Sequence, residues 1–226
     1  MPNPNPGSSR ISFQWKYVDR YLQSLPKGGD NEIFTTILNI GCSDDPAELG
    51  DMAWHLDIDD WSYNFSRFIQ ADAHNLFMIP DLSFDVVIMG DIIEHLYDPW
   101  RAIQEAARVC RGVFLMTIFE EWTLPGYGQF IDVGAVHGDE ASQKLGYANR
   151  EEYQTKTFPK RIGVSDDKVP HLVHINQFTD DDIRKFVEDL IAQGWTMIEY
   201  SKAYEATFEK HPWYNWLIAL SRGVPV

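Results

Sequence analysis

The fold is decided by the segment Phe84-Asp-Val-Val-Ile-Met-Gly-Asp-Ile-Ile-Glu-His-Leu96. Residues 86–90 form an apolar run without a helical period, which predicts a parallel strand buried on both faces. Farther along, Asp98 is a candidate N-cap and Pro99 a first helical residue. We expect an amphipathic helix there, followed by a second buried strand over 113–118. The segment therefore predicts one strand–helix–strand unit of an α/β protein.

Shorter strands are predicted upstream, and small or acidic residues follow each of them. Residues 34–40 are apolar and β-branched, and they end at Gly41-Cys42-Ser43, where small residues allow a sharp backbone turn. The segments 54–57 and 68–72 each finish at an aspartate. In open α/β sheets, ligands bind outside the carboxyl ends of the strands. These residues therefore mark the expected ligand site.

Four of these segments resemble, in order, motifs I to IV of the class I methyltransferases that depend on S-adenosylmethionine (SAM). They are Leu38-Asn-Ile-Gly-Cys-Ser43, His55-Leu-Asp57, Gln70-Ala-Asp-Ala73 and the segment from Phe84-Asp to Glu94-His-Leu96. The resemblance covers about residues 33–118. It implies a Rossmann-like fold, with a seven-stranded, mostly parallel sheet and flanking helices. It also implies that the last strand is antiparallel and inserted beside its predecessor.

The resemblance implies a set of cofactor-binding residues, which are Gly41, Cys42, Ser43, Asp57, Ile58, Asp72, Ala73, Gly90 and Asp91. Asp57 would accept hydrogen bonds from the ribose hydroxyls, because a carboxylate at a strand end can bind both. Asp72 would accept from the adenine amino group, and Gly90 would lie near the methionine part. The alternative role for Asp57 and Asp72 is turn formation, for which aspartate is common after strands.

A dinucleotide is the other ligand class that this kind of turn can bind. Its fingerprint requires glycine at positions 41, 43 and 46, where this chain has glycine, serine and proline. Asp44 and Asp45 would also repel a pyrophosphate. SAM carries no phosphate, and its amino-acid end includes an ammonium. The local charge therefore favours SAM over NAD.

Motif I departs from the family pattern. Asn39 stands in place of an acid, and Ser43 and Asp45 stand in place of glycines, so it is open how the methionine end of SAM is held. The segment Asp45–Gly50 has the signals of one capped helical turn, with Asp45 as N-cap, Pro46 first and Gly50 at the end. The first helix of the family is therefore predicted to be reduced to about one turn.

The rest of the chain is predicted to complete a single domain over residues 11–226. Residues 1–10 are expected to be a disordered head, and a helix is expected over 11–25, with aromatic residues that pack on the sheet or contact the cofactor. A second helix, N-capped by Thr179, should end at Gly194. The last two strands are predicted at 195–200 and 215–220, joined through 204–214.

Residues 120–174 lack regular patterning and are rich in glycine and aromatic side chains. Because this segment follows the carboxyl end of a strand, we interpret it as a lid over the site, the alternative being a disordered insertion. Its aromatic residues suggest a small or apolar-aromatic methyl acceptor: Trp122, Tyr127, Phe130, Tyr147 and Tyr153.

No catalytic residue is required by the predicted reaction. Methyl transfer is an in-line displacement, and good alignment supplies about 7–11 kcal/mol of the barrier. A base is needed only where the acceptor must lose a proton. The candidates are His95, in the Glu-His-Leu signature, and His174, at the far end of the lid. For His95 the alternative role is capping or packing.

Two other functions stay open. Lid residues could ligate a metal, namely His137, Asp139, Glu140, His171 and His174. They come from separate irregular segments, so no metal is predicted. The altered motif I and the short first crossover would also suit a methyltransferase-like scaffold without activity.

Charge limits the class of partner. The net charge is −15, and residues 31–120 hold 16 acidic and 4 basic residues. Nucleic acids and anionic membranes are bound by basic surfaces, so neither is expected as a partner. No apolar run approaches the roughly 18 residues of a membrane span, and two cysteines form no disulfide framework. We therefore expect a soluble, cytoplasmic enzyme with a small-molecule acceptor.

Overall fold

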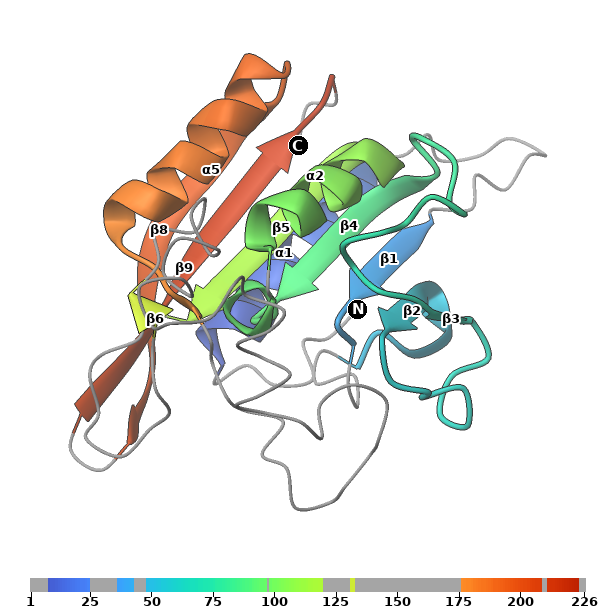
Figure 1. Ribbon diagram of the computed structural model, residues 1–226, viewed down its shortest axis with the longest axis horizontal. Coiled ribbons are helices and arrows are strands. Elements are labelled where there is room, and N and C mark those ends of the chain that lie inside the picture. The colour runs from blue at the N-terminus through green and yellow to red at the C-terminus, as the bar shows by residue number, and fades with distance from the viewer. Residues whose placement is uncertain are drawn as a thin grey trace.

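The computed structural model of the 226-residue chain describes residues 8–24, 36–42, 48–96, 98–119, 131–132, 176–208 and 211–223. Its elements, shown in Figure 1, are α1 (Ser9–Ser24), β1 (Ile37–Ile40), η1 (Gly50–Met52), β2 (Ala53–Asp57), β3 (Phe68–Gln70), β4 (Phe84–Gly90), η2 (Ile93–His95), α2 (Pro99–Val109), β5 (Cys110–Phe119), β6 (Ile131–Asp132), β7 (Asn176–Gln177), α5 (Asp180–Ala192), β8 (Thr196–Phe208) and β9 (His211–Ser221). None of the helices in these ranges is long and apolar enough to span a membrane.

The centre of the molecule is a seven-stranded sheet in the order β3-β2-β1-β4-β5-β9-β8. Neighbouring strands run parallel from β3 to β5, whereas β9 is antiparallel to both of its neighbours. This confirms the predicted sheet, including a last strand inserted beside its predecessor. The chain runs outward from β1 to β3 and then returns to β4, so the strand order switches between β1 and β4. Ligands of such sheets bind at this switch point.

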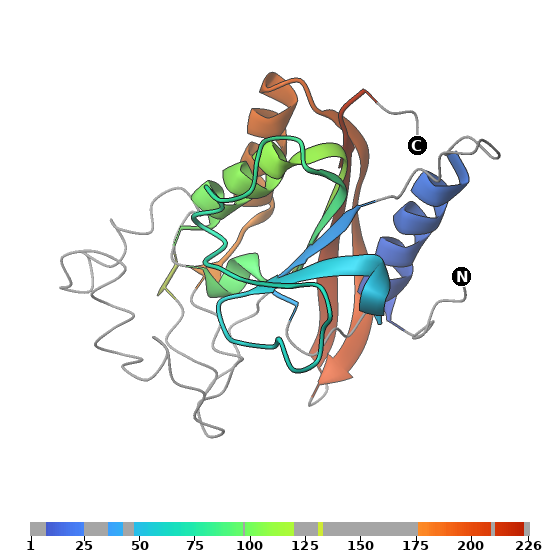
Figure 2. The same ribbon diagram turned by 90° about the vertical axis from the view of Figure 1, so that its right-hand side faces the viewer.

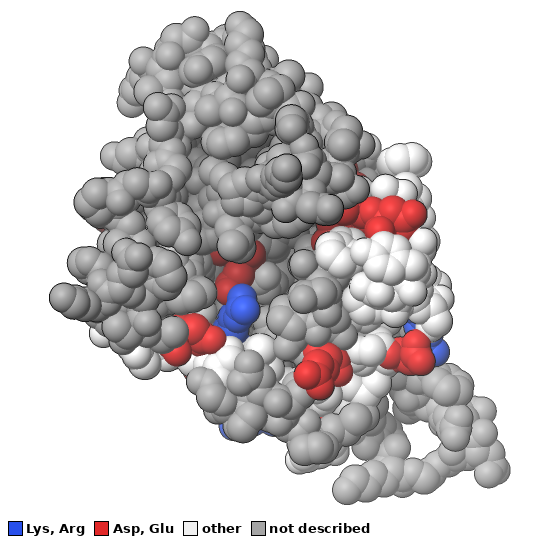
Figure 3. Space-filling view, turned by 90° about the horizontal axis from the view of Figure 1, so that it is seen from below, with Lys and Arg blue, Asp and Glu red and all other residues white. Residues whose placement is uncertain are grey.

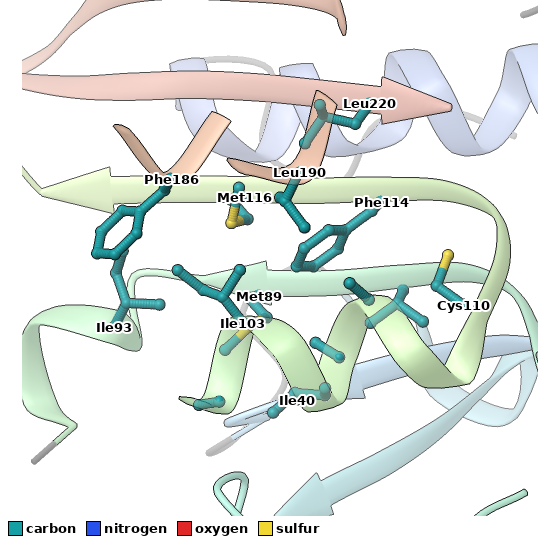
Figure 4. Close-up of a cluster of buried hydrophobic side chains, with 14 of the residues drawn as sticks. Ile40, Met89, Ile93, Ile103, Cys110, Phe114, Met116, Phe186, Leu190 and Leu220 are labelled. Carbon is teal, nitrogen blue, oxygen red and sulfur yellow. The ribbon is translucent and has the colours of Figure 1, made fainter. Parts of the chain in front are cut away.

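Helices cover both faces of the sheet. α1 lies on one face, and α2 and α5 lie on the other (Figure 2). The larger apolar cluster fills the space between the sheet and the α2–α5 layer (Figure 4). Among its fully buried side chains are Ile40, Met89, Ile103, Phe114 and Phe186. The amphipathic pattern of α2 therefore produces the buried face that it predicts.

Helix α1 agrees with the predicted helix, except that it begins at Ser9, inside the segment predicted to be disordered. Glu205 of β8 binds its first turn, accepting hydrogen bonds from the N–H groups of Ser9 at 2.7 Å and Arg10 at 3.2 Å. A carboxylate stabilises a helix N-terminus in this way. The aromatic residues of α1 pack against the sheet, as predicted: Phe13, Trp15, Tyr17 and Tyr21.

The unit from β4 to β5 confirms the central prediction. Six of the seven residues of β4 are buried, which explains the apolar run over residues 86–89. Asp98 is the N-cap of α2, because its side chain accepts from the N–H of Arg101 at 3.1 Å, and Pro99 is the first helical residue. β5 begins directly after α2, at Cys110.

The crossovers between β1 and β4 contain no α-helix in their described residues. The short helix before β2 is a 3₁₀ helix that begins at Gly50, whereas the sequence predicted a turn that ends there. Most of that predicted turn lies outside the described residues. Residues 58–67 and 71–83 are turns and irregular segments. The α-helices therefore gather over the half of the sheet that runs from β4 to β8.

The C-terminal elements are longer than predicted. Thr179 and Asp182 form the expected capping box of α5. The predicted connection over 204–214 is wrong, since Tyr204 pairs with Tyr214 within the β8–β9 ladder. The aromatic and β-branched residues of this segment have high strand propensity, which favours their pairing in the ladder.

Of the predicted lid at 120–174, the structure describes only Ile131–Asp132, which forms β6 and pairs in parallel with β7. The aromatic residues of the lid and the candidates His137, His171 and His174 lie outside the described residues.

Candidate active site

The carboxyl ends of β1, β2 and β3 are joined in a row by backbone hydrogen bonds. The N–H of Gly41, after β1, donates to the carbonyl of Leu56 in β2 at 2.7 Å, and the N–H of Ala71, after β3, donates to the carbonyl of Asp57 at 2.9 Å. β4 continues the row beside β1. The structure therefore brings the predicted residues Gly41, Cys42, Asp57, Ile58, Asp72, Ala73, Gly90 and Asp91 to one edge of the sheet, whereas Ser43 lies outside the described residues.

Gly41, directly after β1, lies against the segment that follows β4. Its φ is +70°, in the left-handed region that favours glycine. A Cβ atom at this position would lie 2.2 Å from Cδ1 and 3.1 Å from Cβ of Ile92, just after β4. Only glycine fits this turn, as the small-residue pattern predicts.

Asp57 ends β2, as predicted, and its carboxylate is held in a local turn. Its Oδ1 accepts a hydrogen bond from the backbone N–H of Asp59 at 3.1 Å. The side chain of Ile58 between them is 62% exposed, which leaves an apolar surface open beside Asp57. β3 ends at Gln70, so Asp72 follows this strand by two residues rather than ending it.

Asp72 is fixed by His74, a buried residue that the sequence analysis did not select. The backbone N–H and the Nδ1 of His74 both lie within hydrogen-bond distance of Oδ1 of Asp72, at 2.9 and 2.5 Å. Burial raises the pKa of Asp72, and the hydrogen bonds from His74 lower it by more, so the net pKa lies below its usual value. The carboxylate is therefore ionised at neutral pH and can accept hydrogen bonds.

Asp91 follows β4 in a left-handed conformation with φ of +49°. Its Oδ1 accepts from the Thr117 hydroxyl at 2.7 Å, and its backbone N–H donates to the carbonyl of Thr117 at 2.9 Å. Its Oδ2 forms an ion pair with Arg10 of α1. Burial lowers the pKa of Arg10, but Asp91, Glu205 and Glu94 raise it by more, so the net pKa is raised.

Gly90 lies under the first half of α1. A Cβ atom there would be 2.7 Å from Nε2 of Gln14, a buried polar residue of that helix. Arg10, Gln14, His74 and Thr117 are the site neighbours that sequence reasoning missed. Only His74 had a local signal, since it lies two residues after an aspartate, the spacing of an Asx turn.

The structure describes His95 but not His174, the other candidate base. His95 is the last residue of η2 and is half-buried, and Glu94 beside it is fully buried, with its Oε1 accepting from the N–H of Phe119 at 3.4 Å. The Glu-His-Leu signature and the role of His95 stay predictions, and His174 lies outside the described residues. Among the described residues, no group of three or more side chains is arranged to hold a metal.

The described part of the surface at this end carries mainly acidic side chains and few basic ones (Figure 3). Such a surface does not attract a phosphate backbone.

Comparison with known proteins shows a sequence similarity in the central part of the chain. Residues 40–114, about a third of the chain, match the family model of a methyltransferase domain. Over this part of the chain, the sequence is similar to a methyltransferase domain. The matched part includes Gly41, Asp57, Asp72 and Asp91, whereas α1 lies outside it.

Solved structures share the fold of this chain. A SAM-dependent methyltransferase from Methanosarcina mazei is 16% identical, with a TM-score of 0.53, over 91% of this chain and 98% of the other. The [4+2]-cyclase SpnF is 12% identical, with a TM-score of 0.51, over 93% and 81%. A putative methyltransferase from Bacillus halodurans is 11% identical, with a TM-score of 0.50, over 93% and 100%. No curated protein matches the chain. Because one of these structures is a cyclase, the shared fold by itself does not assign an activity.

Proposed function

We propose that this protein transfers the methyl group of SAM to a small-molecule acceptor by in-line displacement. The observation that carries the proposal is the row of strand ends, which holds the carboxylates of Asp57 and Asp72 on neighbouring strands beside the Gly41 turn. Asp57 binds the ribose hydroxyls, and Ile58 lies against the adenine. Asp72, whose Oδ1 is held by His74, accepts from the adenine amino group.

The cofactor part of this proposal is tested by thermal unfolding. A ligand at a hundred times its dissociation constant stabilises the folded state by about 2.7 kcal/mol. For a domain of this size, the melting temperature should rise by about 5–10 °C. We expect this shift with SAM or S-adenosylhomocysteine and not with NAD. No shift at millimolar S-adenosylhomocysteine would contradict the proposal and favour the scaffold alternative.

The acceptor is proposed to be small and apolar or aromatic. The supporting observations are the net charge of −15, which opposes binding to nucleic acid, and the aromatic residues in the sequence of the predicted lid. A panel of hydroxyl-, amine- and thiol-bearing aromatic compounds tests this by release of S-adenosylhomocysteine. Turnover with RNA or an unfolded protein, and with none of the small compounds, would contradict it.

The rate enhancement is proposed to come mainly from alignment of the methyl group and the acceptor atom. His95 and His174 are the candidate bases, and either is required only if the acceptor loses a proton. The pH dependence of kcat for His95→Gln and His174→Gln tests them. If the histidine is the base, its replacement lowers kcat and removes the fall of kcat at acidic pH. If the histidine only packs, its replacement changes kcat but not the pH dependence of kcat.

A further inference from the structure

The ion pair between Arg10 and Asp91 places a cation and an anion side by side at the carboxyl end of β4, one of the two strands that flank the switch point. Arg10 comes from the first turn of α1, and Asp91 directly follows β4. Ile92, the next residue, is the one that packs against the Gly41 turn. Asp91 is therefore adjacent in sequence to the residue that lies against the turn of motif I, where the methionine end of SAM is expected.

Both partners are held in place by other residues. The Thr117 hydroxyl fixes one oxygen of Asp91, and Asp91 adopts a left-handed backbone conformation there. Glu205 fixes the start of α1 through the N–H groups of Ser9 and Arg10. Because Glu205 already occupies the helix N-terminus, an incoming carboxylate would bind the guanidinium of Arg10 and not the helix end.

Arg10 carries more N–H donors than its contact with Asp91 uses. A guanidinium carries several N–H groups in a planar fork that suits a carboxylate. The recorded side-chain partner of Arg10 among the described residues is Asp91, which it contacts through Nη1. The Arg10 side chain is 27% exposed, so its remaining N–H groups can be reached by a ligand.

We propose that Arg10 binds the carboxylate and Asp91 the ammonium of the amino-acid end of SAM. This inference rests on the proposed function and deepens it. It accounts for the altered motif I, in which Asn39 replaces the usual acid, because Asp91 then supplies the negative charge. It also adds a binding residue from α1, which lies outside the part that matches the family model.

The test compares S-adenosylhomocysteine with 5′-methylthioadenosine, which keeps the adenosine and the sulfur but lacks the amino-acid end. Calorimetry should show that the wild type prefers S-adenosylhomocysteine by at least about 100-fold, because two charged contacts are lost in the shorter ligand. In Arg10→Met, the affinity for S-adenosylhomocysteine should fall about 10- to 100-fold, and that for 5′-methylthioadenosine should change less than about threefold. Asp91→Asn should behave in the same way.

Lys16→Met is the matched control. It removes a cation of the same helix that pairs with Glu199 and not with Asp91, so it should leave the ratio of the two affinities unchanged. If Arg10 merely anchors α1, Arg10→Met will weaken both ligands equally, and the inference is overturned. If the wild type binds S-adenosylhomocysteine but Arg10→Met keeps its full preference for it, the inference fails while the proposed function stands. If the wild type binds neither ligand, the proposed function itself fails.

A ligand variant keeps the test independent of folding. The carboxamide of S-adenosylhomocysteine removes the ligand's negative charge and can be measured on the wild type. We expect it to bind about tenfold or more weakly than the acid, and equal binding would overturn the role of Arg10.

Discussion

The imidazole Nδ1 of His74 lies 2.5 Å from Oδ1 of Asp72, and the two residues are joined a second time by the His74 backbone N–H. The ring is 3% exposed, and its Nε2 accepts a hydrogen bond from the N–H of Asp98 at 3.2 Å. Nδ1 therefore carries the proton that is donated to Asp72. The Asp72 carboxylate is therefore held through Oδ1.

His74→Ala should weaken binding of S-adenosylhomocysteine about tenfold, because Asp72 loses a hydrogen bond to a charged group that fixes its orientation. His74→Asn is the informative partner, since its amide nitrogen can replace Nδ1 as the donor to Asp72. Calorimetry should find His74→Asn within about threefold of the wild type. If the asparagine variant binds as weakly as the alanine variant, positioning by the Nδ1 bond is the wrong explanation.

The parts of the fold that sequence reasoning predicted are those whose signals are local. The strand over 84–90 is buried on both faces, and residues 86–89 within it are continuously apolar. The start of α2 is encoded by Asp98 and Pro99, which are adjacent in the chain. Most of the candidate site was predictable for a related reason, since parallel strands bring their carboxyl ends to one edge whatever lies between them.

The parts that were missed depend on distant pairing. Tyr204 and Tyr214 become strand residues through their ladder with each other, and neither shows a strict alternation of apolar and polar neighbours. Arg10 meets Asp91 across 81 residues, and Ser9 meets Glu205 across 196. No spacing rule connects residues so far apart in the chain. The segment up to residue 10 was therefore predicted to be disordered, and its contribution to the site was missed.

Gly41→Ala should destabilise the fold and weaken cofactor binding, because the new Cβ would meet Ile92 at 2.2 Å and φ is positive. Gly50→Ala is the control: its φ is +50°, but nothing lies within 4 Å of the added Cβ. Both should lose about 1 kcal/mol to backbone strain, and Gly41→Ala should lose about 1–3 kcal/mol more to overpacking. Adding Ile92→Ala should restore part of that extra loss in denaturant unfolding. Equal losses for the two glycine variants would contradict the close approach.

Asp85 should carry a pH-dependent part of the stability. Its buried carboxylate accepts from Nε and Nη2 of Arg111 at 2.7 and 2.8 Å, from the Tyr21 hydroxyl at 2.9 Å, and from the N–H of Thr36 at 2.9 Å. Burial raises its pKa, and these hydrogen bonds lower it by more, so the net pKa lies below its usual value. The stabilisation is therefore fully present above the ordinary aspartate pKa of about 3.9 and is lost as the pH falls through the lower pKa of the folded state.

Asp85→Asn should reduce the free energy of unfolding by about 2–4 kcal/mol at neutral pH, because several bonds to a buried charge are weakened. The difference from the wild type should shrink as the pH falls through that window. Asp81→Asn is the control, since Asp81 also pairs with an arginine, Arg108, at 2.7 Å, but its side chain is 73% exposed. It should cost less than about 1 kcal/mol. A pH-independent loss for Asp85→Asn would show that shape and not charge is responsible.

Asp57→Ala should weaken binding of S-adenosylhomocysteine and leave the fold intact. The carboxylate is proposed to accept from the ribose hydroxyls, and bonds to charged groups contribute about 1.5–3 kcal/mol each. Water replaces part of this in the variant, so we expect a loss of about 10- to 100-fold in affinity.

Asp59→Ala is the matched control, because it keeps the backbone N–H that Asp57 accepts from and removes only a side chain two residues beyond. Calorimetry should show little change for Asp59→Ala, and melting curves should show both variants folded. Asp57 pairs with Gln70 at the last position of the β2–β3 ladder. If Asp59→Ala weakens binding and Asp57→Ala does not, the ribose lies beyond the end of the strand and Asp57 does not bind it.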